Sequence, residues 1–273
     1  MRIWEQGLVA TYSLPGYKEL ILQHYAQYQR VDTEIVIHGV RDDASPSAAK
    51  IAGRAVNYAY LHRFHDTQII ENVRRAEREG FDAVIIGVLQ DSGLQVARSM
   101  VDIPVIGYGE ISMLTAVMHG SRFAFVCINP DMDPLVQKMI HDLGLASRAA
   151  PTAYMDCGYP DLHDAVNGKP ERFLTAFRDA SKTAMRKHGV DVLLPGQTII
   201  AELLWREGIR ELDGALVLDP RLPLLRMAEM LVDMRKAGFG TSRRGFFWSR
   251  PPAELVQGVD DFYATPERFE NPE

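Results

Sequence analysis

Short apolar runs alternate along the chain with longer amphipathic segments. Some runs, such as Ala83–Gly87, contain almost no polar residue, which is typical of parallel strands buried on both faces. This alternation predicts an α/β fold with mainly parallel sheets flanked by helices. The expected strands are Arg2–Gly7, Glu34–Gly39, Ala83–Gly87, Val105–Tyr108, Arg122–Cys127, Val192–Leu194 and Ala215–Leu218.

The segments between these runs have helical periodicity. Several of them end at a glycine, such as Gly80 or Gly189, and glycine readily adopts the left-handed conformation that closes a helix. The expected helices are Gly16–Gln29, His65–Glu79, Gly93–Met100, Ser112–His119, Asp133–Leu143, Pro170–His188, Thr198–Glu207 and Pro220–Ala237.

The sequence also repeats itself. Residues 80–88 (Gly-Phe-Asp-Ala-Val-Ile-Ile-Gly-Val) match residues 189–197 (Gly-Val-Asp-Val-Leu-Leu-Pro-Gly-Gln) almost position for position, and Arg2–Gly7 has a weaker counterpart in Arg122–Cys127. Such a pair predicts two pseudo-symmetric lobes with a cleft between them. We expect residues 1–116 and 215–245 to form the first lobe and residues 117–214 the second. Residues 246–273 are expected to form an extended arm that packs on the body or on a neighbouring subunit.

Composition narrows the possible partners. The net charge of −6 disfavours nucleic acid and anionic membranes, which bind basic surfaces. The two cysteines, Cys127 and Cys157, do not indicate a disulfide framework, and the N-terminal residues do not resemble a secretion signal, so we expect a cytoplasmic protein. No apolar run reaches the length of a membrane span.

The candidate chemistry lies where the expected strands end. In open parallel sheets, ligands bind beyond the carboxyl ends of the strands, and two facing lobes would direct these loops into one cleft. Loops that lead into helices also present free backbone N–H groups, which suit carboxylate or imide oxygens. The residues at these positions are Gln6, Val88, Gln90, Asp91, Ser92, Glu110, Cys127, Asn129, Gln197 and Thr198.

Residues 82–94 and 102–110 resemble the core of the hydantoin racemases, within the aspartate/glutamate/hydantoin racemase superfamily, and so does the closing run 227–245. The similarity extends from Arg2 to about Gly245. It implies two lobes and two catalytic thiols, one from each lobe, on opposite sides of the substrate's α-carbon. The matching positions here are Val88 and Gln197, which are also partners in the internal repeat. Neither side chain is an acid or base near neutral pH, so two-thiol racemisation is not expected.

We therefore expect an enzyme that acts on a small carboxylate or cyclic amide by hydrolase or lyase chemistry rather than racemisation. The candidate acids, bases and nucleophiles are His65, Asp91, Glu110 and Cys127. The expected substrate contacts are Gln6, Val88, Gln90, Ser92, Asn129, Gln197 and Thr198. Structural roles stay open for several of them: helix capping for Asp91, Ser92, Glu110 and Thr198, and simple burial for Cys127.

Two other functions stay open. The chain could be a catalytically inactive protein that binds a small molecule, or a racemase or isomerase that uses Cys127. We expect no metal, because His62 and His65 are too few ligands, and no cofactor, because the sequence contains no nucleotide-binding glycine motif. The last segment and the family resemblance favour a homo-oligomer.

Overall fold

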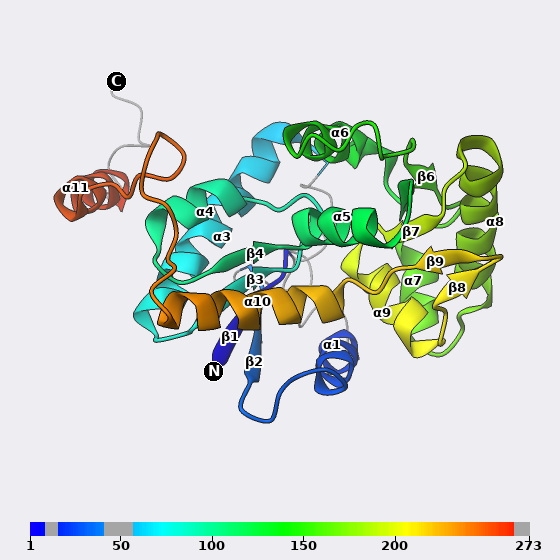
Figure 1. The fold of residues 1–273 in the computed structure, drawn as a ribbon, viewed down its shortest axis with the longest axis horizontal. Coiled ribbons are helices and arrows are strands. Elements are labelled where there is room, and N and C mark those ends of the chain that lie inside the picture. Colours follow the sequence, from blue (N-terminus) through cyan, green and yellow to red (C-terminus); the bar gives the residue numbers. More distant parts are fainter. Residues whose placement is uncertain (9–15, 41–56, 265–273) are drawn as a thin grey trace, which may run out of the picture.

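The computed structural model describes residues 1–8, 16–40 and 57–264, which form two α/β lobes side by side (Figure 1). The sheet of the first lobe is parallel and has the order β2-β1-β3-β4. Its strands are β1 (Arg2–Gln6), β2 (Glu34–His38), β3 (Ala83–Ile86) and β4 (Val105–Gly107).

The sheet of the second lobe has the order β6-β5-β7-β9-β8, and its β8–β9 pair is antiparallel. Together the two flanked sheets confirm the predicted α/β class. The strands of this second sheet are β5 (Phe123–Cys127), β6 (Ala153–Tyr154), β7 (Val192–Pro195), β8 (Glu211–Leu212) and β9 (Ala215–Val217).

Each expected helix is present, with ends that differ by a few residues. The largest difference is at α3, which begins at Ala59 rather than His65. The short helix α7 was not predicted. The helices in chain order are α1 (Tyr17–Ala26), α3 (Ala59–Arg78), α4 (Leu94–Met100), α5 (Tyr108–His119), η2 (Pro130–Met132), α6 (Asp133–Asp142), α7 (Tyr159–Val166), α8 (Glu171–His188), α9 (Thr198–Arg206), α10 (Arg221–Lys236) and α11 (Ala253–Ala264).

The shared Asp of the sequence repeat has the same structural role in both lobes. Asp82 accepts a hydrogen bond from the backbone N–H of Arg2 (2.7 Å) and donates its own N–H to the Arg2 carbonyl (2.8 Å). Asp191 makes the same pair of contacts with Arg122, at 2.8 and 3.0 Å. In each lobe this Asp, directly before β3 or β7, therefore fixes the register with the neighbouring strand β1 or β5.

The boundary expected at residue 215 is wrong by one strand. β9 pairs with β7 and so belongs to the second sheet, because Ala215–Val217 continues the buried parallel ladder of that lobe. The chain then returns through α10, which packs against β3, β4 and α5 in the first lobe. The apolar core includes Ile85 and Ile106 of the first sheet and Phe125 of the second, so it is continuous between the lobes.

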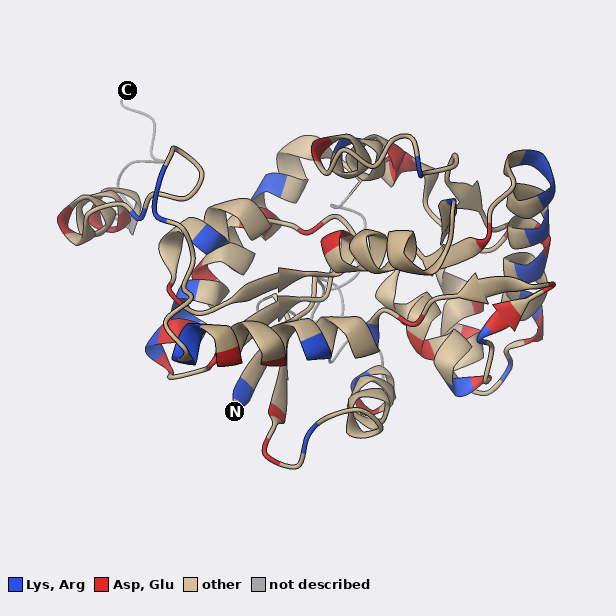
Figure 2. Ribbon diagram, in the orientation of Figure 1, with Lys and Arg blue, Asp and Glu red and all other residues tan. Residues whose placement is uncertain are grey.

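The segment after α10 is not simply extended, because Ala253–Ala264 forms helix α11. Ion pairs fasten this segment to the first lobe: Asp102 contacts Arg243 and Arg250, and Asp260 contacts Arg74 at 2.7 Å. Figure 2 shows charged residues of both signs along this segment and α11, at the left of the view. Residues 265–273 of the expected arm lie outside the described residues, and contact with a neighbouring subunit stays a prediction.

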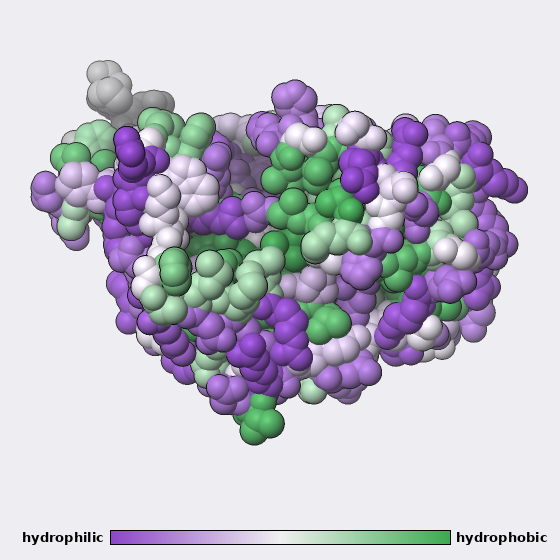
Figure 3. Space-filling model, in the orientation of Figure 1, coloured by the Kyte–Doolittle hydropathy of each residue, from purple (hydrophilic) through white to green (hydrophobic). Residues whose placement is uncertain are grey.

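One face of the molecule exposes large apolar side chains around α5 and the outer side of α10 (Figure 3). A hydrophobic surface of this kind is compatible with the predicted homo-oligomer. Within the described residues, no helix is both long and apolar enough to cross a membrane. The exposed side chains on these two helices are Leu114, Met118, Leu222, Met230 and Met234.

Candidate active site

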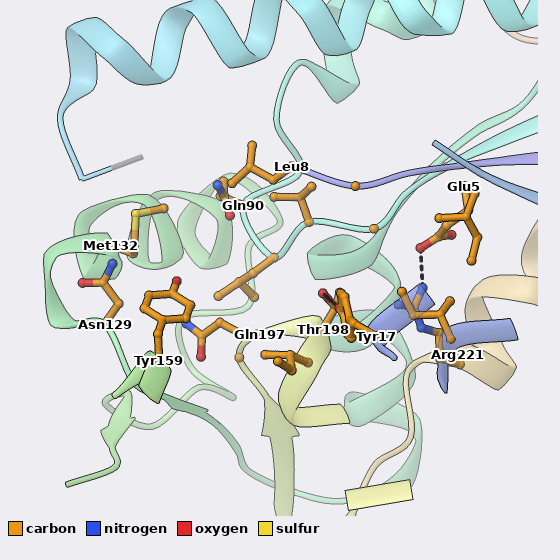
Figure 4. A pocket seen from close by; sticks show the side chains of 18 residues that line it. Glu5, Leu8, Tyr17, Gln90, Asn129, Met132, Tyr159, Gln197, Thr198 and Arg221 are labelled. Atoms are coloured by element: carbon orange, nitrogen blue, oxygen red, sulfur yellow. Dashed lines mark hydrogen bonds and ion pairs between the residues drawn. The ribbon is translucent and has the colours of Figure 1, made fainter. Parts of the chain in front are cut away.

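A pocket lies between the lobes, at the carboxyl ends of β1, β3 and β7 (Figure 4). Glu5 and Arg221 lie at one end of it, and Asn129 and Tyr159 at the other. Most of the wall between these ends is apolar, as in many small-molecule sites. Among the described residues, the lining consists of Glu5, Gly7, Leu8, Tyr17, Ile21, Ile37, Gly87, Val88, Leu89, Gln90, Asn129, Met132, Tyr159, Gly196, Gln197, Thr198, Ile199 and Arg221.

The two repeat partners Val88 and Gln197 both line this pocket, one from each lobe. Val88 follows β3 by two residues, and Gln197 stands in the same position after β7. The Oε1 atom of Gln197 accepts a hydrogen bond from the backbone N–H of Ile128 (3.2 Å). The amide is thereby oriented, and the structure gives its Nε2 group no partner among the described residues.

Three further residues expected to bind substrate line the pocket. Thr198 shares a hydrogen bond with the Tyr17 hydroxyl (2.9 Å), so its hydroxyl bridges α9 to α1. Gln90 donates from Nε2 to His62 (3.1 Å), and Asn129 donates to Asn57 (2.7 Å). With Val88 and Gln197, these residues form the part of the expected site that the structure brings together; their contact with a substrate stays a prediction.

The other two expected substrate contacts do not line the pocket. Gln6 is fully buried, where its Oε1 accepts hydrogen bonds from Trp4 (2.9 Å) and Asn72 (3.0 Å). Ser92 is also buried, just before α4. Gln6 lies outside the pocket because neighbouring residues of a strand point to opposite faces, and the preceding residue Glu5 is the one that faces the pocket.

None of the four candidate catalytic residues lines the pocket either. Asp91 accepts hydrogen bonds from the backbone N–H groups of Gly109 (2.8 Å) and Glu110 (2.7 Å), so it caps α5. Burial raises the pKa of Asp91 to about 8, although these N–H groups favour the charged form. Glu110 pairs with both terminal nitrogens of Arg98, at 3.1 and 2.5 Å. The two carboxyl groups thus connect α5 to the loop and helix beside it.

His65 and Cys127 lie in packed surroundings. His65 is on α3, and burial lowers the pKa of its imidazole. Cys127 ends β5 directly beneath Gly196, where a Cβ would overlap its Sγ atom. The sequence correctly places Cys127 at a strand end, but its side chain packs under the second-lobe loop and not into the pocket.

A buried polar network at the end of the pocket was not predicted from the sequence. Arg221 donates hydrogen bonds to the carboxyl groups of Glu5 in the first lobe and Glu202 in the second, the latter at 2.6 Å. The Tyr25 hydroxyl donates to Glu5 (2.8 Å) and accepts from Arg221 (2.9 Å). The sequence signal that could have indicated it is a charged residue directly after the apolar pair of a strand, Glu5, and another at the start of a helix, Arg221.

His24 extends this network away from the pocket. Its Nδ1 atom lies 2.6 Å from Glu202 and its Nε2 atom 2.8 Å from Asp219, so each ring nitrogen faces a carboxylate oxygen. Both nitrogens must carry hydrogen to satisfy these contacts, which makes His24 an imidazolium. Burial opposes that charge, but the two carboxylates prevail and raise the pKa of His24.

Comparison with known proteins places the chain in a family. The family model described as Asp/Glu/Hydantoin racemase matches residues 28–228, which is more than half of the chain. The chain belongs to the Asp/Glu/hydantoin racemase family. In sequence it is 27% identical over 233 residues to a hydantoin racemase of Pseudomonas sp. (strain NS671), covering 85% of this chain and 86% of that one. It is 28% identical over 184 residues to a hydantoin racemase of Paenarthrobacter aurescens, covering 67% and 73%.

Solved structures agree on the fold. Allantoin racemase from Klebsiella pneumoniae superposes with a TM-score of 0.72 at 22% identity, covering 92% of this chain and 94% of that one. Allantoin racemase from Pseudomonas fluorescens gives 0.73 at 21% identity, covering 92% and 97%. Identities this low show the fold alone. The family model and the hydantoin racemase relatives confirm the expected superfamily and support a racemase-type enzyme that acts on a small molecule.

This member of the Asp/Glu/hydantoin racemase family has thiols only at Cys127 and Cys157. Burial raises the pKa of Cys127 to about 12, and the side chain is 2% exposed. Burial also raises the pKa of the partly exposed Cys157 to about 11. Because the thiolate is the reactive form, neither sulfur is suited to act as a base near neutral pH.

We expect iodoacetamide to label native protein slowly at Cys157 and not at Cys127, because Cys127 is enclosed by packed backbone. Mass spectrometry of the alkylated protein measures this directly. The Cys157→Ser variant should take up no label until it is denatured, when Cys127 becomes reactive. Rapid labelling of that variant in the native state would show that the Cys127 thiol is accessible.

Proposed function

We propose that this family member is an enzyme that acts on a small carboxylate or cyclic amide between the lobes, by hydrolase or lyase chemistry with a non-thiol acid or base. The observation that carries the proposal is the presence of Val88 and Gln197 on the walls of one pocket. Two-base racemisation needs a titratable group on each side of the α-carbon, and neither residue supplies one.

The lining residues also favour a class of substrate. With Oε1 held by Ile128, the amide of Gln197 can direct its Nε2 donors to a carbonyl oxygen. The apolar lining, which includes Ile21, Ile37 and Ile199, suits an uncharged ring or an apolar substituent. A 5-substituted hydantoin or a related cyclic amide meets both conditions, and the relatives named hydantoin racemase make hydantoins the first compounds to test.

The proposal is tested by incubating the protein with hydantoins, amino acids and substituted malonates. Chromatography detects ring opening or loss of carbon dioxide, and NMR in D₂O detects exchange at the α-carbon. Ring opening or decarboxylation without racemisation supports the proposal. Racemisation with α-carbon exchange contradicts it and favours the isomerase. Binding in a thermal-shift assay without any turnover contradicts it and favours the binding protein.

For a compound that is turned over, we expect Gln197→Leu to lower kcat/KM about fivefold or more, because one lost neutral hydrogen bond costs roughly 1 kcal/mol. The measurement is steady-state kinetics at fixed pH. Gln137→Leu, at an exposed position on α6, is the matched control and should leave kcat/KM unchanged. Equal kinetics for the two variants would remove Gln197 from the substrate-binding role.

A further inference from the structure

Glu5 carries a carboxyl group, lines the pocket and was not predicted from the sequence. It lies in β1, one residue before the strand ends at Gln6, and its side chain is 3% exposed. A Cβ on Gly87 would overlap its Oε1 atom, so the carboxyl group lies directly against the backbone that leads into Val88. Glycine is required there because this close approach leaves no room for a side chain.

The four charged groups that contact one another beside Glu5 are balanced without it. Arg221 and the imidazolium of His24 provide two positive charges, and Glu202 and Asp219 provide two negative ones. An ionised Glu5 would add a third negative charge to a cluster that is almost completely buried. A buried charge without compensation is costly, and a carboxyl group avoids that cost by binding a proton. In the same direction, burial raises the pKa of Glu5, although Arg221 opposes the shift.

We propose that Glu5 is a catalytic residue of this pocket: a neutral carboxylic acid that delivers a proton to the substrate. The inference rests on the proposed function. When a bond from carbon to a leaving group such as carbon dioxide breaks, its electron pair stays on the substrate. The O–H bond of Glu5 then breaks and its proton bonds to that atom. Glu5 becomes a carboxylate and regains a proton from water.

The surroundings of Glu5 suit this cycle. The carboxylate formed in the step is held by the Arg221 guanidinium and by the Tyr25 hydroxyl at 2.8 Å. Arg221 is a positioning residue, since Glu202 fixes its Nε atom at 2.6 Å and His24 in turn holds Glu202. A single acid on one side of the pocket supports proton delivery to one face of the substrate, which differs from the two-sided exchange of a racemase.

The first test compares Glu5→Gln with the wild type on a compound that the wild type converts. The amide keeps the shape of the carboxyl group but carries no transferable acid proton, so kcat should fall at least about 100-fold while binding by thermal shift persists. Glu229→Gln is the matched control: Glu229 is equally buried and pairs with Arg226 (2.6 Å), outside the pocket. This control should lose stability but keep its kcat. Unchanged kcat in Glu5→Gln overturns the proposal.

The second test does not depend on turnover. Infrared difference spectra of the wild type and Glu5→Gln should contain the carbonyl band of a protonated carboxylic acid, and that band should shift when a hydantoin or malonate binds. Absence of the band, or no shift on binding, overturns the proposal. If the band shifts but no compound is converted, the proposed function fails and the catalytic role fails with it, while the proton on Glu5 is established. Should Glu5→Gln not fold, Glu5→Asp replaces it: the shorter acid should retain the band and lose most of the turnover.

Discussion

Introducing thiols at both repeat positions, as Val88→Cys with Gln197→Cys, is expected to create a racemase. The two positions follow equivalent strands of opposite lobes and line the same pocket, so their sulfurs would approach a bound α-carbon from two sides. A thiol with a pKa near its ordinary value of about 8.5 exchanges protons at mildly alkaline pH, and general acid–base catalysis contributes about 10²–10⁴-fold. We therefore expect at least about 100-fold faster α-carbon exchange than in the wild type.

The measurement is deuterium incorporation into a 5-substituted hydantoin, followed by NMR together with the loss of optical rotation. Each single cysteine variant should be much less active than the pair, because two-sided exchange needs both groups. The pair Val88→Ser with Gln197→Ser has side chains of similar size without thiols and is the matched control. If the cysteine pair folds and binds hydantoin but is no more active than the serine pair, the two positions do not flank the α-carbon.

The replacement Arg221→Met is expected to destabilise the protein by roughly 3–5 kcal/mol. Arg221 is 1% exposed and donates to Glu5 and Glu202, so its removal leaves the buried Glu202 carboxylate without its arginine and the buried Glu5 carboxyl group without a donor. Chemical denaturation followed by circular dichroism measures the free energy of unfolding. Lys138→Met removes an exposed lysine that pairs with Asp142 on the surface of α6, so it should cost only about 0.3–0.5 kcal/mol. Equal losses for both variants would contradict the structural role of the network.

Most of the fold could be predicted because strands, helices and the internal repeat each leave a pattern within a short stretch of sequence. Runs such as Ala83–Ile86 have the uniform burial of parallel strands, and the Gly-x-Asp repeat marks the same backbone contact in both lobes. The two-residue strands β6 and β8 were missed because so short a segment has no periodicity. Helix α11 was missed because a basic, aromatic and proline-containing stretch precedes it.

The candidate site was predictable only in part. Val88 and Gln197 could be placed because the repeat fixes their positions after matching strands. Glu5 and Arg221 could not, because 216 residues separate them along the chain and only the packed lobes bring them together. Asp91 and Glu110 carry carboxyl groups that could act as acids or bases. In the structure, backbone N–H groups bind Asp91 and Arg98 binds Glu110, and these contacts cannot be read from the sequence.

The return of the chain to the first lobe through α10 has a consequence for biosynthesis. The second lobe is a continuous stretch inserted into the first, whose sheet receives α10 only after the second lobe has been made. Ile85 and Ile106 share one apolar cluster with Leu224 and Leu225 of α10. Until the ribosome has released this helix, the apolar surface of the nascent first lobe that α10 covers is exposed to solvent, where chaperones can bind it or aggregation can begin. The second lobe can by then already form its complete sheet.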